Sequence, residues 1–137
     1  MRIAVIPGLI LAMIAACSSD VAKTSDSPQS AAEAFLALVD QGNYQESWSE
    51  ASSWLRDNVD ASQWAEHAGS YRQPLGIVKN RKLDSIEFQG SLEDMPDGKY
   101  AFVIFDSSLA DTSSASEMVG LMLDEDSMWR VIGYQTL

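Results

Sequence analysis

The residues that most often form disulfides, metal sites and catalytic centres are scarce in this chain. Its 137 residues include one cysteine, one histidine and four prolines. One cysteine cannot form a disulfide within the chain, and with only one histidine beside it the chain does not favour a zinc site. The fold must therefore be stabilised by its apolar core, and we expect neither a metal nor a cofactor.

Basic residues are also few. Nine Lys and Arg oppose twenty Asp and Glu, which gives a net charge of −11. Proteins that bind nucleic acid carry clustered Lys and Arg to meet the phosphates, so we expect no nucleic-acid partner. The same deficit argues against electrostatic docking on anionic lipid. Solubility is the simplest explanation of the charge, and a specific basic partner is the alternative.

No apolar run at the N-terminus is long enough to cross a bilayer as a helix. Residues 3–16 are apolar and follow a single charge, Arg2, but they fall short of the roughly 20 residues that a spanning helix needs. A charged start, an apolar middle and a small-residue end are typical of a secretory signal peptide. We therefore assign residues 1–16 to a signal peptide and exclude them from the fold.

The signal peptide ends in Ile14-Ala15-Ala16-Cys17, which resembles the lipobox of bacterial lipoproteins. The resemblance implies cleavage between Ala16 and Cys17 and attachment of lipid, palmitate among it, to Cys17. Two or more acyl chains anchor a protein stably without spanning the membrane. Ser18 in place of an aspartate favours the outer membrane over the inner membrane, with the domain facing the periplasm. The alternatives are an ordinary signal peptide that leaves a free thiol, and an uncleaved membrane helix.

Residues 17–29 form the lipidated cysteine and a polar linker. The stretch from Ser18 to Pro28 is rich in serine and almost free of large apolar side chains, a composition that does not form a core. Fully extended, these eleven residues reach about 40 Å, so the domain stays close to its membrane. Residues 30–137 have the usual size of a single domain.

The first part of that domain predicts three helices. Their apolar stripes are Ala31, Phe35, Leu38 and Val39; Tyr44, Trp48, Ala51 and Leu55; and Trp64, Ala68, Tyr71 and Leu75. Gly42-Asn43 ends the first helix as a left-handed cap would. Asp60 or Ser62 caps the third helix, and Pro74 to Gly76 marks its end.

The second part of the domain predicts strands. The four segments are residues 78–89, 100–105, 118–123 and 129–134. The polar turns Met95–Gly98 and Asp124–Ser127 separate them. Helices followed by strands indicate the α+β class, with an antiparallel β-meander covered on one face by N-terminal helices. We expect a cone-shaped domain of the nuclear transport factor 2-like or cystatin-like kind.

A series of motifs runs in order through the domain. They are Ala34–Tyr44 with Ser47-Trp48; Tyr71–Gly76 with Arg81-Lys82-Leu83; Pro96–Tyr100; Glu117-Met118-Val119; and Trp129–Tyr134. In this order they resemble a bacterial family known as domain of unknown function 4019, over residues 31–134. The resemblance implies a small secreted or lipid-anchored protein and assigns it no activity.

An acid/base enzyme built on this chain would have to use His67, with Asp40 as its carboxylate partner. His67 lies at the edge of the third apolar stripe, three residues after Trp64, and no third orienting group is identifiable. We therefore favour a partly exposed surface histidine and expect no enzymatic activity. The acidic turn at residues 124–126 lacks the glycine and final glutamate of a calcium-binding loop.

Arg72 and Arg81 are the most informative polar residues, because cations are scarce and both lie in the family-like motifs. One interpretation is a clamp for the carboxylate or phosphate of a small ligand. The other is an ion pair that ties the third helix and the first strand to Asp40 or Glu117. We favour the ion pair because acidic partners are abundant.

The four tryptophans divide into two groups. Trp48 and Trp64 lie on apolar helical stripes and Trp129 opens a strand, so these three are predicted core residues. Trp54 lies off the stripe of its helix and is the candidate for contact with a partner.

Taken together, the sequence predicts a lipid-anchored, non-enzymatic interaction or accessory module of the cell envelope, with an envelope protein as partner. A binder of small anionic ligands that uses Arg72 or Arg81 is the first alternative. An acid/base enzyme that uses His67 and Asp40 is the second.

Overall fold

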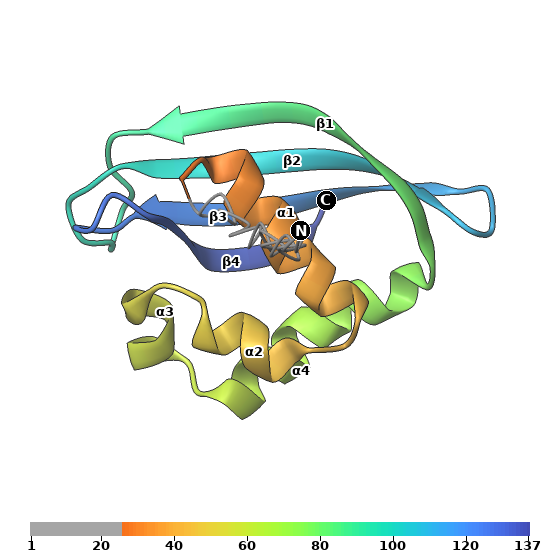
Figure 1. Ribbon diagram of the computed structural model, residues 1–137, viewed down its shortest axis with the longest axis horizontal. Helices are drawn as coiled ribbons and strands as arrows, with labels where there is room; N and C mark the ends of the chain where they lie inside the picture. Colours follow the sequence, from red (N-terminus) through yellow and green to blue (C-terminus); the bar gives the residue numbers. More distant parts are fainter. Residues whose placement is uncertain (1–25) are drawn as a thin grey trace, which may run out of the picture.

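The computed structural model describes residues 26–137. The predicted signal peptide, Cys17 and the linker up to residue 25 lie outside the described residues. The elements are α1 (Pro28–Asp40), α2 (Tyr44–Ser49), α3 (Ser53–Asn58), α4 (Ala61–Arg72), a 3-10 turn η1 (Gln73–Leu75), β1 (Val78–Gln89), β2 (Tyr100–Leu109), β3 (Ser114–Leu123) and β4 (Trp129–Thr136). This order confirms the predicted α+β class (Figure 1). Between residues 26 and 137, no helix combines the length and the apolar character that crossing a bilayer requires.

The end of α1 follows from local sequence. Gly42 adopts a φ of 75°, in the left-handed region that a side chain would strain. Its N–H donates to the carbonyl of Val39, and the N–H of Asn43 donates to the carbonyl of Leu38. These two backbone hydrogen bonds together form a Schellman motif. It confirms the predicted left-handed cap and makes Asp40 the last residue of α1.

The prediction of one continuous second helix is wrong. The chain leaves the helix after Ser49, and α3 begins at Ser53. The N–H of Ser52 donates to the carbonyl of Val131 in β4 at 3.0 Å, so it cannot continue the bonds of α2. The hydroxyl of Ser52 accepts from the N–H of Leu55 at 3.1 Å and caps α3. A contact with a distant strand therefore divides the helix.

The predicted third helix is α4. Of its two predicted caps, Asp60 is the one used: its carboxylate accepts from the N–H of Gln63 at 2.8 Å, and the Gln63 side chain accepts from the N–H of Asp60 at 3.0 Å. This reciprocal pair is a capping box. The chain then passes through η1 and turns at Gly76, which has a φ of 64°.

The four strands form one antiparallel sheet in the order β1-β2-β3-β4. β2 and β3 extend beyond the predicted bounds, because they continue as a hairpin that pairs Ser108 with Ser114. The predicted bounds followed the apolar runs, and the added ends are polar, so the pattern did not include them. The pairing of β3 with β4 shifts by one residue between Gly120 and Leu121, a bulge that bends the strand locally.

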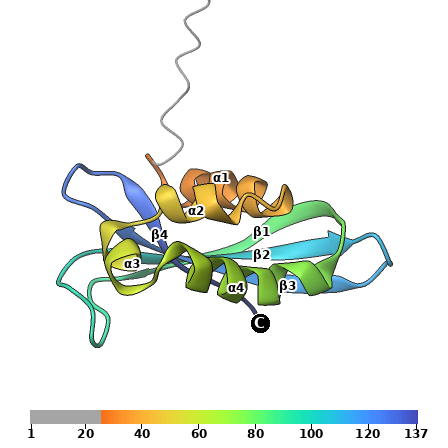
Figure 2. The same cartoon turned by 90° about the horizontal axis from the view of Figure 1, so that it is seen from below.

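The core lies between the sheet and the helices. In Figure 2, α1 lies over one side of the sheet, and Figure 1 shows α2, α3 and α4 along its β4 edge. The buried residues of this layer include Phe35 and Leu36 of α1, Trp64 of α4, Val103 and Phe105 of β2, and Val119 and Leu121 of β3. The Phe35 ring lies 5.4 Å from that of Tyr134 and 6.1 Å from that of Trp64.

The other face of the sheet carries no helix within residues 26–137. We call it the open sheet face. Its central positions are the half-buried Phe102, Ile104, Met118 and Ile132, with Gly120 and Gly133 between them. The β1–β2 loop covers one end of this face, where the hydroxyl of Tyr100 donates to the carbonyl of Pro96.

Candidate functional site

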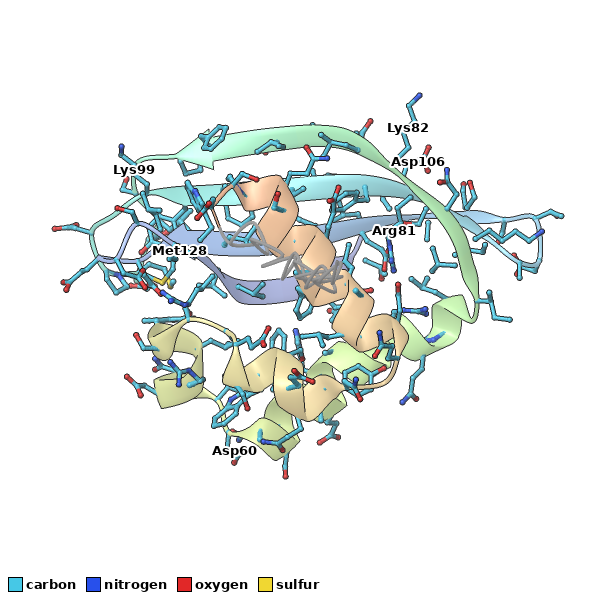
Figure 3. All side chains as sticks on the ribbon, in the orientation of Figure 1. Asp60, Arg81, Lys82, Lys99, Asp106 and Met128 are labelled. Carbon is cyan, nitrogen blue, oxygen red and sulfur yellow. The ribbon has the colours of Figure 1, made fainter. Side chains whose placement is uncertain are left out.

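Asp40, Arg72 and Arg81 meet in one ion cluster. Asp40 ends α1 and Arg72 ends α4. Arg81 of β1 and Glu117 of β3 complete the cluster. Arg81 lies on the helix side of the sheet, whereas the next residue, Lys82, points outward (Figure 3), as the alternation of a strand requires. Four elements therefore supply one charged group each.

Arg81 is the centre of the ion cluster. Its Nε donates to Glu117 Oε2 at 2.6 Å, and its Nη2 donates to Glu117 Oε1 at 3.2 Å. On its other edge, Nη1 donates to Asp40 Oδ2 at 2.6 Å and Nη2 donates to Asp40 Oδ1 at 2.7 Å. One guanidinium thus holds two carboxylates, each through a pair of charge-assisted hydrogen bonds.

Glu117 is fully buried, with an exposed fraction of 0%. Besides Arg81, it accepts from Ser107 Oγ at 2.5 Å and from the Tyr134 hydroxyl at 2.7 Å. A buried carboxylate is tolerated only when it is paired and hydrogen-bonded, and Glu117 meets both conditions. In the described part of the chain, every buried side-chain nitrogen or oxygen has a hydrogen-bond partner.

Arg72 is buried and joins three segments. Its Nε donates to Asp40 Oδ1 at 3.0 Å, and its Nη1 donates to the carbonyl of Gly76 at 2.7 Å. It therefore connects the end of α4, the end of α1 and the turn that leads into β1. This is the structural ion pair that we favoured from the sequence, with Asp40 as the shared carboxylate.

The pKa values of the cluster reflect these bonds. Burial alone would raise the pKa of Glu117, but the hydrogen bonds, those from Arg81 foremost, outweigh burial and hold the pKa below its usual value. The pKa of Asp40 is also lowered, because Arg81 and then Arg72 outweigh its burial. Burial, followed by the charge of Glu117, raises the pKa of Tyr134. Both carboxylates therefore stay ionised at neutral pH while the phenol stays a neutral donor.

The ion cluster has no net charge, because two guanidiniums face two carboxylates. A ligand carboxylate or phosphate that approached Arg81 would meet Asp40 and would have to displace it. Such a displacement would leave the protein's own carboxylate without its partner, which is costly. The arrangement therefore favours cohesion between elements over binding of an anion.

A cavity of about 480 Å³ opens beside the ion cluster, between α1 and β1. Asp40 and Arg81 form part of its wall, and Glu33 and Lys79 are its other charged residues. Two acidic and two basic groups again balance. Arg72 does not line this cavity, so the two arginines do not form a joint clamp facing it.

His67 and Asp40 do not share a site. His67 is exposed on α4, with its ring 5.7 Å from Trp64 and 5.3 Å from Tyr71. It borders a hollow on the open sheet face, whereas Asp40 lines the cavity between α1 and β1. A proton could not pass directly between the two side chains, so the geometry assembles no acid/base pair from them.

The tryptophans are placed mainly by packing. Trp64 and Trp129 are buried, and the half-buried Trp48 donates from its ring N–H to the carbonyl of Val59 at 2.7 Å. Trp54, the predicted partner contact, is half-buried and packs against the core. The most exposed large aromatic residue is Phe88, at 64%, which the sequence analysis did not single out.

The acidic turn between β3 and β4 is tied to its own strand. Arg130 Nη1 lies 2.7 Å from Asp124 Oδ2, and its Nη2 lies 2.7 Å from Asp126 Oδ2. Two of the three acids in the turn thus have a basic partner. Across residues 26–137, no three His, Cys, Asp or Glu side chains gather closely enough to hold a metal ion.

A second cavity, of about 390 Å³, lies between α1, α2 and β4. Phe35, Leu38 and Trp129 give it an apolar wall. The exposed Phe88 ring lies 6.1 Å from Trp129, which extends the apolar surface beyond the cavity. This region lies near the start of α1 (Figure 1).

Ser107 and Tyr134 are the members of the site that the sequence analysis missed. The available signal was a polar residue at an inward strand position: Ser107 lies between the buried Phe105 and Leu109 on β2. The pairing of Arg81 with Ser107 across β1 and β2 could not be derived without the register. Tyr134 lies in an apolar strand segment, so the sequence gives no sign that its hydroxyl binds a buried carboxylate.

One family matches the chain, under the description "Protein of unknown function (DUF4019)", over residues 31–134. The match runs from the first turn of α1 to Tyr134 in β4 and includes all four residues of the ion cluster. No curated protein matches the chain.

Proposed function

The chain belongs to the DUF4019 family, and we propose that it is a lipid-anchored, non-enzymatic interaction module of the bacterial cell envelope. The observation that supports the absence of enzymatic activity is that the charged groups of the ion cluster already bind one another. Asp40, Arg81 and Glu117 are bonded to one another at 2.6 to 3.2 Å. A catalytic group must be free to act on a substrate, and these groups are engaged with one another.

The anchor is argued from the N-terminal sequence. Ile14-Ala15-Ala16-Cys17 places the only cysteine of the chain at the position that lipid transfer requires. The described domain starts α1 at Pro28, eleven residues after Cys17, a distance of at most about 40 Å when extended. Such a short tether keeps the domain at the membrane surface. Ser18 favours the outer membrane.

The interaction role is supported by apolar surface that the fold leaves uncovered. The open sheet face presents half-buried apolar side chains, and Phe88 adds an exposed ring near the 390 Å³ cavity. Exposed apolar patches on a soluble domain mark contact sites. The domain is thus equipped to hold other proteins near the membrane.

Metabolic labelling with palmitate tests the anchor. We expect the wild-type chain to incorporate label and to fractionate with the outer membrane, and Cys17→Ser to do neither. The matched control is Ser19→Ala, which alters the linker and leaves the lipobox intact. Membrane retention of Cys17→Ser would contradict the anchor. Ser18→Asp should retain the label and shift the chain to the inner membrane.

Crosslinking in intact cells tests the interaction role. We expect the wild-type chain to yield defined crosslinked species in the membrane fraction, and Cys17→Ser to yield fewer, because the domain is no longer concentrated at the surface. Absence of any crosslinked species above background in wild-type cells would argue against an interaction module.

A further inference from the structure

The strands at the centre of the sheet are apolar on both faces. In an antiparallel sheet with one solvated face, apolar and polar residues alternate. Residues 101–105 of β2 are instead apolar at every position, and residues 118–122 of β3 contain only apolar residues and a glycine. Continuous apolar runs are typical of strands that are covered on both faces. The helices cover one face, and the open sheet face is the second.

We propose that the open sheet face packs against the same face of a second copy of the chain, forming a two-fold symmetric dimer. The proposal deepens the interaction role proposed above by naming the first partner. It rests on the proposed lipid anchor only for the direction of the symmetry axis.

The area of the face fits a dimer interface. Four strands about 4.8 Å apart and about ten residues long at 3.4 Å each give a face of roughly 650 Å². A stable protein interface buries about 800 Å² of accessible surface per partner. The β1–β2 loop covers one end of the face, while the relief of the side chains adds accessible area elsewhere, so the two values are of the same order.

The charges on the face favour a second copy over a basic partner or an anionic membrane. Cleavage of the predicted signal peptide would change the net charge from −11 to −12, because it removes one basic and no acidic residue. The paired strand positions on this face carry only Lys82, Glu87 and Asp106 as exposed charges, and Lys82 pairs with Asp106 in the register. Other exposed acids near the face lie in the β1–β2 loop at one end of it, at residues 93, 94 and 97. A basic partner finds little to attract it here. Two acidic copies can meet over the centre of the face with little repulsion.

The face is complementary to itself. Phe102 lies across from Gly120, and Ile104 across from Met118, in the β2–β3 register. If the two-fold axis runs between β2 and β3 along the strands, β2 of one copy lies over β3 of the other. Phe102 then faces the partner's Gly120, and Ile104 faces the partner's Met118. The Phe102 ring already lies over Gly120 of its own chain, 3.3 Å from where a Cβ would stand, so the two Phe102 rings meet each other near the axis, and Ile104 packs on the flexible Met118.

The anchor selects this axis. An axis along the strands brings both α1 N-termini to the same end of the dimer, the end where β4 begins (Figure 1). Two sheets and two helix layers, each spaced by about 10 Å, separate those termini by about 30 Å. Each linker reaches about 40 Å when extended, so both copies can be anchored in one membrane. An axis across the strands would place the two linkers at opposite ends.

Sedimentation equilibrium of the full chain, extracted from membranes in a density-matched detergent, tests the dimer. We expect twice the mass of one mature chain at micromolar concentration. Met118→Glu places a charge in the middle of the face and should weaken association at least tenfold. The matched control, Ile77→Glu, changes an apolar residue that is 72% exposed and lies outside the strands, and it should remain dimeric.

A crosslinking measurement keeps the proposal testable if Met118→Glu fails to fold. Ser116 lies on the same face at the polar end of β3. Ser116→Cys should form dimers with a short bismaleimide in intact cells. Ser49→Cys, exposed on α2 and on the α1 side of the sheet (Figure 2), should not.

Two results would overturn the dimer. One is a wild-type chain that sediments as a monomer throughout the concentration range. The other is crosslinking of Ser116→Cys to a different protein in place of a second copy. A monomer that still incorporates palmitate would contradict the dimer and support the proposed anchor. A dimer that lacks palmitate would support the dimer and contradict the anchor.

Discussion

At the residue scale, Glu117 shows how a buried charge is kept in this protein. Its carboxylate receives hydrogen bonds from Arg81, Ser107 and Tyr134. The sequence offered Arg81 and Glu117 as an ion pair because acids are abundant and cations few. It could not show that both carboxylates share one guanidinium, because that depends on strand register and on where α1 ends.

Replacing Glu117 should be strongly destabilising. Glu117→Gln keeps the size of the side chain but leaves Arg81 buried with one carboxylate fewer. We expect a loss of about 3–5 kcal/mol in the free energy of unfolding, the usual cost of breaking a buried ion pair. Urea unfolding followed by tryptophan fluorescence measures it. The control Asp106→Asn, on an exposed position of β2, should change stability by less than about 0.5 kcal/mol; equal effects of the two variants would contradict the burial argument.

Acid should unfold the domain through the same cluster. The pKa values of Asp40 and Glu117 are lowered in the folded state, so below a pH of about 4 the unfolded chain binds more protons than the folded chain. The stabilisation is complete above the unfolded pKa values and is lost as pH falls through the lower, folded ones. Urea midpoints between pH 7 and pH 3 should decline accordingly. The decline should be shallower in the double variant Asp40→Asn/Glu117→Gln, and an unchanged slope would show that other carboxylates dominate.

At the scale of elements, signals that lie within a few residues were read correctly. The Schellman end of α1, the Asp60 cap of α4 and the position of β1 all follow from neighbouring residues. The break between α2 and α3 was missed, because Ser52 bonds to Val131, which is far away in the sequence. The polar ends of β2 and β3 were missed because pairing, and not apolar pattern, holds them in the sheet.

The end of α1 offers a clean test of a local signal. Gly42→Ala places a Cβ on a residue with a φ of 75°, and we expect a loss of about 1 kcal/mol of stability. Thermal unfolding measured by circular dichroism reports it. Gly90→Ala is the matched control, since no atom lies within 4 Å of its added Cβ and its φ is not left-handed. If Gly42→Ala left the stability unchanged, the left-handed cap at Gly42 would not be what ends α1.

At the scale of the whole molecule, net charge, tether and open sheet face act together. The chain is strongly acidic, so we expect no electrostatic attraction to anionic lipid to assist the proposed anchor. The fold turns one face of its sheet to the helices and leaves the other without a helix among residues 26–137. The sequence showed the apolar runs of β2 and β3, but not which of their side chains the helices would cover.

The scarcity of basic residues predicts how the proposed lipoprotein would be held at a membrane. If acyl chains alone anchor it, washing membranes with 1 M salt should release none of the wild-type chain, because salt screens charges and leaves apolar contacts intact. Immunoblotting of pellet and supernatant measures the release. A basic peripheral protein of the same membranes serves as the control that salt removes. Release of the chain by salt would indicate an ionic attachment.

The sequence by itself determined the α+β order, the ends of α1 and α4 and the four strand segments. Of these, α4 is determined at its start, since it gives way to η1 after Arg72, and β2 and β3 are determined only in their apolar parts. These features depend on residues close together in the chain, through caps, glycine conformations and apolar periodicity. Only the tertiary structure decided that Asp40, Arg72, Arg81 and Glu117 form one neutral cluster, that His67 and Asp40 line different cavities, and that one sheet face stays open. Each of these depends on atoms brought together from distant elements, where register and packing set the distances.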